Sequence, residues 1–389
     1  MPYHALDYYR LDEQLTEEER MIRDAVRSWV SDRVIPKIDE AFRDHFFPQE
    51  WIPEMAELGL FGPTLPEEYG GAGIGDIAYG LAMQELERGD SGIRSFASVQ
   101  SALVMYPIYT WGSEEQKRNL LPKLARAELI GAFGLTEPDA GSDPGSMLTT
   151  ATKVDGGYRL NGAKMWITNS TIADILVVWA KLDGVVNGFL VEKGADGLTC
   201  PETTGKWSLR ASVTGEIVMQ DVFVPEEMRM PDANGLKCPL MCLNQARYGI
   251  TWGVLGAAQA CFDSSLQYAL SRPQWGKPIA GFQAVQEKLV HMATEITKGQ
   301  LLCYRLGQMK QNGTSSFRQV SMAKGNNCRV ALEIARIARD IHGANGITDE
   351  YPIMRHMMNL ESVYTYEGTD TMHTLIVGSD LTGLEAYKG

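Results

Sequence analysis

The chain has 389 residues, of which 44% are apolar and 22% charged, and its formal net charge is −13 at pH 7. This composition is typical of folded globular domains and excludes a disordered or fibrous chain. The length exceeds what one hydrophobic core usually holds, so two or three domains are expected. The negative charge argues against a nucleic-acid surface, and no apolar run reaches the roughly 20 residues that cross a bilayer.

The first third of the sequence is predicted to be helical. Thr16 and Glu19 have the spacing of a capping box, and the apolar residues that follow recur on one face of a helix that Pro36 is expected to stop. Ser113 is expected to begin another helix. The opening segment is acidic and lacks the layout of a secretory signal or a transit peptide. A bacterial cytoplasm is therefore expected, or the mitochondrial matrix if a transit peptide has been removed.

Short β-type runs follow between about residues 130 and 232. They are separated by turns rich in Gly, Asp and Asn, and they cover residues 158–169, 174–182, 187–193 and 216–225. Strands this short and regular predict a compact antiparallel barrel or sandwich.

Helical periodicity returns after residue 232, in three long segments with short connections. This pattern predicts an up-and-down bundle of four helices. The expected fold class is therefore α+β, with an N-terminal all-α domain over 1–130, a middle β-barrel or sandwich domain over 131–238, and a C-terminal helical bundle over 239–389.

The six cysteines contain no C-x-x-C pair and lie mostly among apolar residues, which is the usage of small buried hydrophobic residues in a reducing compartment. Cys238 and Cys242 are open to a second interpretation as metal ligands. No neighbouring Cys or His completes a ligand set, so no metal site is expected.

Three short motifs carry candidate chemistry. The glycine-rich loop "FGLTEPDAGSD" over residues 133–143 has an irregular backbone whose amides can turn toward a ligand, although such a loop alone is usually an ordinary turn. Trp166 in "MWITNS" offers an aromatic face, although a tryptophan in a strand is by default a core residue. Glu367 in "YTYEGTDTMH" is either a solvated surface charge or a base.

Together with "SRPQWGKPIAGFQ", "GANGITDEYPIMR" and "YEGT", these motifs stand in the order and at the spacing of the acyl-CoA dehydrogenase flavoenzymes. The resemblance covers nearly the whole chain, and several long motifs in register are strong evidence where one would be weak. Within the family, "ELERGDSGIRSFASVQSALVM" and "NQARYGITWGVLGA" resemble the glutaryl-CoA dehydrogenase branch. The resemblance implies FAD-dependent oxidation of glutaryl-CoA with loss of CO2 to give crotonyl-CoA, in a homotetramer that passes electrons to an electron-transfer flavoprotein.

The resemblance implies that Glu367 is the catalytic base. Removing the weakly acidic α-proton of a thioester needs a positioned carboxylate and donors at the developing enolate oxygen. In the family those donors are the N–H of this glutamate and a flavin hydroxyl. A pocket closed by Tyr366 is expected to raise the pKa of the carboxyl, and Gly368 lets the substrate approach closely. Glu361, the competing carboxylate, is interpreted as structural.

Arg94 is implied to read the second carboxylate of the substrate, because burying that charge unpaired is costly. Ser95 and Ser98 are its expected hydroxyl partners, and Glu87 is expected to pair with Arg94 and so weaken its grip on the carboxylate that leaves. The other implied substrate contacts, in the thioester arm and along the CoA path, are Ser142, Asn244 and Arg247.

The resemblance also implies that FAD lies between the β domain and the helical bundle. Arg272 and Gln283 are expected to reach the pyrophosphate and adenine end of a flavin bound mainly by a neighbouring subunit. The other implied flavin residues are Phe133, Gly134, Leu135, Thr136, Gly141, Ser142, Trp166, Ile167, Thr168, Asp340, Gly343, Ala344 and Thr369.

Three residues depart from the family pattern, namely Ile93, Trp275 and His342. Three alternative functions also stay open at this stage. They are a glutaryl-CoA dehydrogenase that does not decarboxylate, a short-chain acyl-CoA dehydrogenase, and a non-redox acyl-CoA protein that keeps the flavin as structure. The last of these should lack the base, and Glu367 is present.

Overall fold

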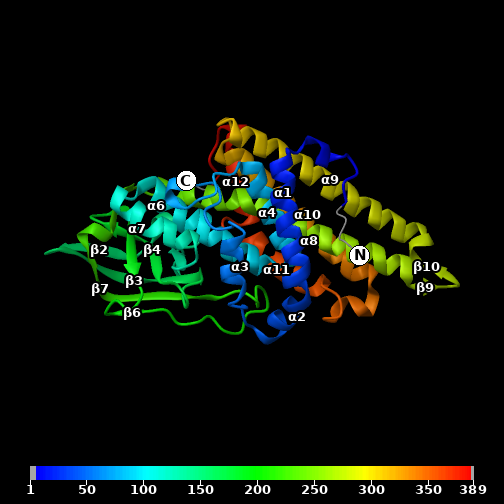
Figure 1. The fold of residues 1–389 in the computed structure, drawn as a ribbon, viewed down its shortest axis with the longest axis horizontal. Coiled ribbons are helices and arrows are strands. Elements are labelled where there is room, and N and C mark those ends of the chain that lie inside the picture. The colour runs from blue at the N-terminus through cyan, green and yellow to red at the C-terminus, as the bar shows by residue number, and fades with distance from the viewer. Residues whose placement is uncertain (1–5, 387–389) are drawn as a thin grey trace.

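A computed structural model describes residues 6–386 of the chain. The strands of the large sheet gather at one end of the long axis of the molecule, and long helices fill most of the rest (Figure 1). In chain order the elements are helical, then β, then helical again. The expected α+β fold, with a β part between two helical parts, is therefore confirmed.

The N-terminal part begins with the predicted capping box. The Thr16 hydroxyl accepts from the Glu19 N–H and the Glu19 carboxylate accepts from the Thr16 N–H, and Ser113 caps its helix in the same way. The α-helices of this part are α1 (Glu17–Trp29), α2 (Ile35–Asp44), α3 (Trp51–Glu57), α4 (Asp76–Gly89), α5 (Ser91–Ser98), α6 (Tyr106–Trp111) and α7 (Glu114–Ala125).

The prediction that Pro36 stops the first helix is wrong. A π-helical segment, Val30–Val34, carries the chain from α1 straight into α2, and Pro36 lies in the first turn of α2. Proline is tolerated there because the first N–H groups of a helix have no intrahelical partner to lose.

The middle part contains one eight-stranded sheet in the order β6-β7-β3-β2-β4-β5-β8, with β1 added beside β4. The expectation of a purely antiparallel sheet is wrong, because β1 and β2 both run parallel to β4. The strands are β1 (Gly131–Gly134), β2 (Thr150–Val154), β3 (Gly157–Thr168), β4 (Ile175–Leu182), β5 (Val185–Glu192), β6 (Leu198–Thr199), β7 (Thr214–Pro225) and β8 (Arg229–Asn234).

The C-terminal part is built on three long helices, with a small hairpin between the first two. Side-by-side packing of α8, α9 and α10 is visible in Figure 1, where the hairpin projects at the end away from the sheet. The elements are α8 (Lys237–Ser271), β9 (Pro273–Gln274), β10 (Lys277–Pro278), α9 (Gln283–Gln311), α10 (Phe317–Ile341), α11 (Ile353–Thr365) and α12 (Asp370–Thr382).

Helices α4 and α8 join the two helical parts through close backbone contact. A Cβ on Gly80 would lie 2.4 Å from the Trp252 ring, and a Cβ on Gly256 would lie 1.8 Å from the Gln84 carbonyl oxygen. Only glycine permits this approach. The contact brings the inner face of α4, which carries Glu87, against α8, which carries Arg247.

Candidate active site

Glu367 lies in the short connection between α11 and α12, in a backbone conformation that is unusual for its residue type. Its φ is +52° and that of Gly368 is +95°, so two successive residues have left-handed φ angles. A non-glycine residue in this region carries a cost of about 1–2 kcal/mol, which neighbouring contacts have to offset. The Glu367 Oε2 atom is buried and has no hydrogen-bond partner among residues 6–386.

Two buried cations hold the carbonyl groups of this connection. Lys324 Nζ donates to the Tyr366 oxygen at 3.0 Å and to the Gly368 oxygen at 2.9 Å. Arg247 Nε donates to the Glu367 oxygen at 2.5 Å. Three successive carbonyls are therefore turned toward cations.

Burial and the neighbouring charges shift the pKa of the Glu367 carboxyl in opposite directions. Burial raises the pKa of Glu367 above its ordinary value, and the nearby Arg94, Arg247 and Lys324 cations oppose that rise. Burial lowers the pKa of Arg247 and of Lys324. The arrangement suits a base, because a raised pKa brings the carboxylate closer to a weakly acidic carbon acid.

Arg94 and Glu87 form a buried ion pair. Arg94 Nε lies 2.6 Å from Glu87 Oε2, and neither side chain is exposed. Glu87 also accepts from the Ser91 hydroxyl at 2.8 Å. The predicted pairing is present, although the two residues lie on different helices, because Asp90 ends α4 and caps α5.

Tyr366 connects this pair to the connection that carries Glu367. Its hydroxyl accepts a hydrogen bond from Arg94 Nη2 and lies 3.3 Å from the Ser95 hydroxyl. Burial raises the pKa of Tyr366, so the phenol stays protonated. Tyr366 is therefore more than a pocket wall, because it orients the guanidinium.

A buried donor of Arg94 has no partner. Arg94 Nη1 makes no hydrogen bond within the described part of the chain, and the hydroxyls of Ser98 and Tyr79 lie close to one another beside it. Buried polar groups are nearly always satisfied, so such a group marks a place where a ligand or water binds. Burial also raises the pKa of Tyr79, so its hydroxyl is available as a donor.

The loop after β1 is held by a second buried lysine. Lys164 Nζ donates to the Leu135 oxygen at 3.1 Å and lies 2.8 Å from Glu137 Oε1. Burial lowers the pKa of Lys164 to about 8. The Thr136 oxygen accepts from the Met165 N–H at 2.9 Å. These bonds fix the loop against β3, so its glycine-rich part turns outward.

Trp166 lies beside this loop and is exposed over 57% of its surface. Its φ is +62°, and the pairing of β3 with β7 shifts register between Lys164 and Ile167. The default interpretation as a core tryptophan is therefore wrong, because the bulge turns the ring outward. An exposed aromatic face beside a fixed loop fits a flat aromatic ligand such as a flavin ring.

The other residues predicted at this half of the flavin site divide into two groups. The side chains of Phe133, Leu135 and Ile167 are buried in the core, so only their backbone atoms can face a ligand. Gly141 and Ser142 are exposed, and Thr136 and Thr168 are half-buried.

Arg272 and Gln283 flank the β9–β10 hairpin, at the end of the molecule away from the sheet (Figure 1). Arg272, His342, Gly343 and Ala344 line one cleft there. His342 stacks on Tyr268 at 4.5 Å between ring centroids and is otherwise buried.

Four predicted residues have other surroundings. Asp340 binds Lys288, and Gln283 donates to Glu287 at 3.1 Å, both on the exposed surface. Thr369 caps α12 by accepting from the Met372 N–H at 3.2 Å. Asn244 has a buried, unpartnered Oδ1 atom on α8. The competing carboxylate, Glu361, is exposed and pairs with Arg336 at 2.6 Å.

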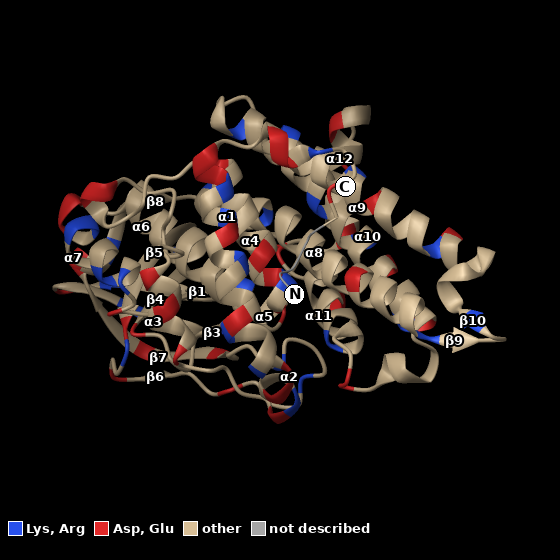
Figure 2. Cartoon of the chain, turned by 45° about the vertical axis from the view of Figure 1, so that its right-hand side comes forward, with Lys and Arg blue, Asp and Glu red and all other residues tan. Residues whose placement is uncertain are grey.

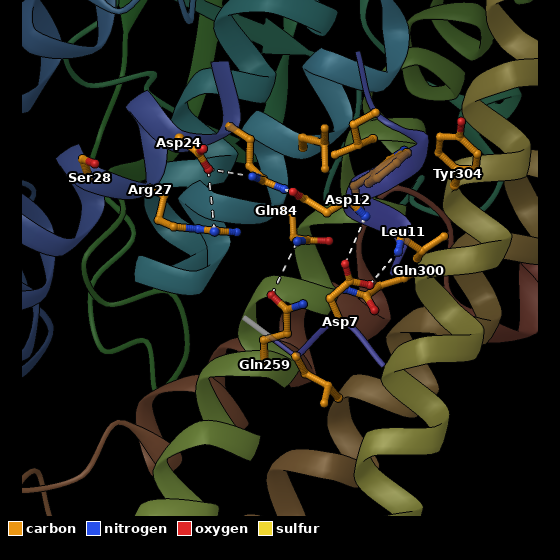
Figure 3. Close-up of a pocket in the computed structure, with 15 residues that line it drawn as sticks. Asp7, Leu11, Asp12, Asp24, Arg27, Ser28, Gln84, Gln259, Gln300 and Tyr304 are labelled. Carbon is orange, nitrogen blue, oxygen red and sulfur yellow. Dashed lines mark hydrogen bonds and ion pairs between the residues drawn. The ribbon is translucent and has the colours of Figure 1, made fainter. Parts of the chain in front are cut away.

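A separate pocket of about 510 Å³ lies under the N-terminal segment, between α1, α4, α8 and α9. Figure 3 shows Gln84 and Gln259 pointing toward one another across it, with Asp7 and Asp12 at the N-terminal segment. None of the predicted site residues lines this pocket. We therefore place the candidate site at Glu367.

Basic and acidic residues are interspersed along the helices and strands (Figure 2). In the part of the chain that the structure describes, no helix has the length and apolarity to cross a membrane. No cluster of three or more His, Cys, Asp or Glu residues suited to a metal ion occurs within residues 6–386.

Sequence reasoning missed five residues of the site. Lys324, His373 and Tyr79 surround Glu367 or Arg94, Lys164 fixes the loop, and Gly253 makes room for the ion pair. A Cβ on Gly253 would lie 2.2 Å from Glu87 Oε2. The one available signal was a lysine in an apolar helical segment, "SMAKGNNCRVALEIA", which is unusual on a buried face.

Comparison with protein families agrees with this geometry. Three family models match the chain: the acyl-CoA dehydrogenase N-terminal domain over residues 16–128, the middle domain over 132–222 and the C-terminal domain over 233–382. The chain belongs to the acyl-CoA dehydrogenase family.

Several of the similar proteins are glutaryl-CoA dehydrogenases. A glutaryl-CoA dehydrogenase structure from Mycobacterium smegmatis is 51% identical, with a TM-score of 0.96 over 97% of this chain and 98% of that one. A second glutaryl-CoA dehydrogenase from that organism, in complex with FADH2, is 46% identical, with a TM-score of 0.97 over 98% and 99%. The glutaryl-CoA dehydrogenase of Desulfococcus multivorans is 34% identical over 385 residues, covering 96% of this chain and 99% of that protein. The chain is thus similar to glutaryl-CoA dehydrogenases, as its motifs predict.

Proposed function

We propose that the protein is a glutaryl-CoA dehydrogenase that oxidises its substrate and then releases CO2 to give crotonyl-CoA. FAD is its cofactor, and it supplies the acceptor for the hydride that leaves the β-carbon of the acyl group. The residues around Trp166 and the loop after β1 would hold the flavin ring. The remaining steps rest on side chains of this chain.

The observation that carries the substrate class is the unpartnered Nη1 atom of Arg94. Arg94, Arg247 and Lys324 contribute three positive charges to the cluster, and Glu87 and Glu367 contribute two negative charges. The cluster therefore has an excess of one positive charge. A second carboxylate on the acyl chain balances that charge and satisfies the buried donor.

Glu367 is proposed to take the α-proton. Its N–H has no acceptor within residues 6–386, so it is free to donate to the thioester oxygen as negative charge develops there. The bond from Arg247 to the Glu367 oxygen helps to hold the connection in place before the substrate arrives.

Decarboxylation follows from the chemistry of the oxidised product. With a double bond between C2 and C3, the C4–C5 bond of the glutaconyl thioester breaks, its electrons enter the conjugated thioester, and C5 leaves as CO2. C4 then takes up a proton, for which protonated Glu367 is the proposed donor. Glu87 shares Arg94 with the departing carboxylate, so the guanidinium holds it less firmly in the ground state.

The proposed assembly is a homotetramer. The cleft lined by Arg272 and His342 lies beside the β9–β10 hairpin, at the end of the molecule away from the sheet (Figure 1), which supports a flavin site completed by a neighbouring copy. The proposed electron acceptor is an electron-transfer flavoprotein, and the proposed location is the bacterial cytoplasm or the mitochondrial matrix.

The test is anaerobic addition of acyl-CoA to the FAD-loaded protein. Glutaryl-CoA should bleach the flavin absorbance, whereas pentanoyl-CoA, which has the same carbon count but no second carboxylate, should do so far more slowly. Glu367→Gln should bind glutaryl-CoA without bleaching. Equal rates with both thioesters would favour a short-chain enzyme.

Carboxyl-labelled glutaryl-CoA tests the second half of the reaction. With an artificial acceptor present, labelled CO2 should be trapped in step with flavin turnover. Glu87→Gln should lower CO2 release more than dehydrogenation. Turnover without labelled CO2 would identify an enzyme that stops at glutaconyl-CoA.

A further inference from the structure

Lys324 is a buried cation that the proposed reaction does not require as an acid, a base or a substrate ligand. Its side chain is fully buried in α10, and within residues 6–386 its ammonium group is bound by the carbonyls of Tyr366 and Gly368 rather than by a carboxylate. Burying an ammonium group without a paired carboxylate is costly. An apolar side chain of the same length would avoid this cost, so we expect a role for the positive charge or the N–H donors of Lys324.

The acceptors of Lys324 point to that role. They are the carbonyls of Tyr366 and Gly368, which flank Glu367 on either side. Glu367 is held at a positive φ between them. A single ammonium group thus bridges both ends of the turn that sets the direction of the Glu367 side chain and N–H.

His373 closes the same turn from α12. A Cβ on Gly368 would lie 3.0 Å from His373 Nε2 and 3.2 Å from Arg247 Nη2, so the ring and the guanidinium pack directly against this glycine. Burial, with the nearby Lys324 and Arg247 cations, lowers the pKa of His373 to about 3, so the ring is neutral. The turn is therefore enclosed on two sides, and Lys324 supplies its bridging hydrogen bonds.

We infer that Lys324 is a positioning residue for the base: it fixes Glu367 in its left-handed turn through the two flanking carbonyls, and its charge favours the ionised carboxylate. This inference rests on the proposed role of Glu367. The charged or titratable groups that face Glu367 are Arg94 on α5, Arg247 on α8, Lys324 on α10 and Tyr79 on α4, with Tyr366 and His373 beside it.

The test compares Lys324→Met with a matched control, Lys206→Met. Lys206 also donates to a backbone carbonyl, that of Ser212 at 2.7 Å, and burial lowers its pKa to about 8, but it lies in the segment between β6 and β7. Both variants are loaded with FAD and reduced anaerobically with glutaryl-CoA from pH 5 to 9.

Lys324→Met should retain FAD, while the rate of flavin reduction at saturating glutaryl-CoA falls at least about tenfold. The acidic limb of its pH profile should move up by about one pH unit, since removal of a neighbouring cation favours the protonated carboxyl. Lys206→Met should match the wild type in both. A wild-type rate and limb in Lys324→Met, or equal losses in both variants, would overturn the inference.

An infrared titration of the carboxyl separates this inference from the proposed function. The protonated-carboxyl band that disappears in Glu367→Gln should titrate about one pH unit higher in Lys324→Met than in the wild type, with no turnover needed. If the wild type oxidises no acyl-CoA, the proposed function fails. The shift still measures the electrostatic effect of Lys324 on the Glu367 carboxyl. If Lys324→Met does not fold, Lys324→Gln replaces it, because glutamine keeps an N–H donor without the charge. Lys324→Gln should show the same shift in the carboxyl titration. The absence of a shift in either folded variant would overturn the inference.

Discussion

A Cβ placed on Gly253 would lie 2.2 Å from Oε2 of Glu87 and 3.1 Å from Nε of Arg94. The absence of a side chain at this position of α8 is therefore what admits the buried ion pair between the helices. The ion pair therefore depends on α8 as well as on α4 and α5, because α8 determines the space available to the two side chains.

Gly253→Ala should displace Glu87 from Arg94. We expect a loss of about 1–3 kcal/mol in the free energy of unfolding from overpacking, and a kcat/KM for glutaryl-CoA lowered by about tenfold or more. Gly378→Ala is the control, since a Cβ at this helical position meets nothing within 4 Å and alanine is the better helix former. Unchanged kinetics in Gly253→Ala would show that the pair tolerates displacement.

Arg94 and Glu87 should show strong coupling in a double-mutant cycle. Arg94→Met leaves Glu87 buried and unpaired, which should cost about 3–5 kcal/mol of unfolding free energy. The double variant Glu87→Gln/Arg94→Met leaves no such charge and should recover much of that loss. Denaturant unfolding at one protein concentration measures both. Additive losses would contradict the charge-pair account.

The fold was predictable where local chemistry decides it. Thr16 and Glu19 cap a helix through their own side chains, and the helical periodicity of the C-terminal segments follows from one buried face. The prediction for Pro36 is wrong because a proline that stops one helix and a proline in the first turn of the next look the same in sequence. The intervening π-helical segment decides between them, and it has no sequence signature.

Only the site residues that stand in recognisable motifs were predictable from the sequence. Arg94 and Glu367 stand in recognisable motifs, whereas Lys324 acts on carbonyls 42 and 44 residues away, and only the folded bundle brings them together. The sequence does not predict that Trp166 is exposed, because the register shift that turns its ring outward arises from pairing with β7. A bulge of this kind is decided by the sheet rather than by the strand.

Glu367→Gln should stabilise the protein at neutral pH. Because burial raises the pKa of Glu367 in the folded protein above its unfolded value, the stability it contributes is full below the unfolded pKa and is lost as the pH rises through the folded pKa. The amide variant should therefore have the higher Tm at pH 7.5, with the difference vanishing near pH 4. Glu361→Gln, at an exposed pair, should change Tm little at either pH. A lower Tm for Glu367→Gln at pH 7.5 would contradict the raised pKa.

His373 should make the protein sensitive to acid. Its pKa is lowered to about 3, first by burial and then by the Lys324 and Arg247 charges, whereas an unfolded histidine titrates near 6.5. Between these values this ring binds more protons in the unfolded chain than in the folded one. His373 alone should therefore lower the free energy of unfolding by about 1.4 kcal/mol for each pH unit below 6.5, in addition to the effects of His342 and His356, whose pKa values burial also lowers.

His373→Gln should reduce the slope by the His373 contribution, which denaturant unfolding at pH 6.5, 5.5 and 4.5 measures. The matched control is His291→Gln, because His291 is an exposed histidine that pairs with Glu333 on the surface. This control should keep the wild-type slope. An unchanged slope in His373→Gln would mean that the ring is protonated in the folded protein, and a cation beside Lys324 and Arg247 would then have to be balanced by the carboxylate of Glu367.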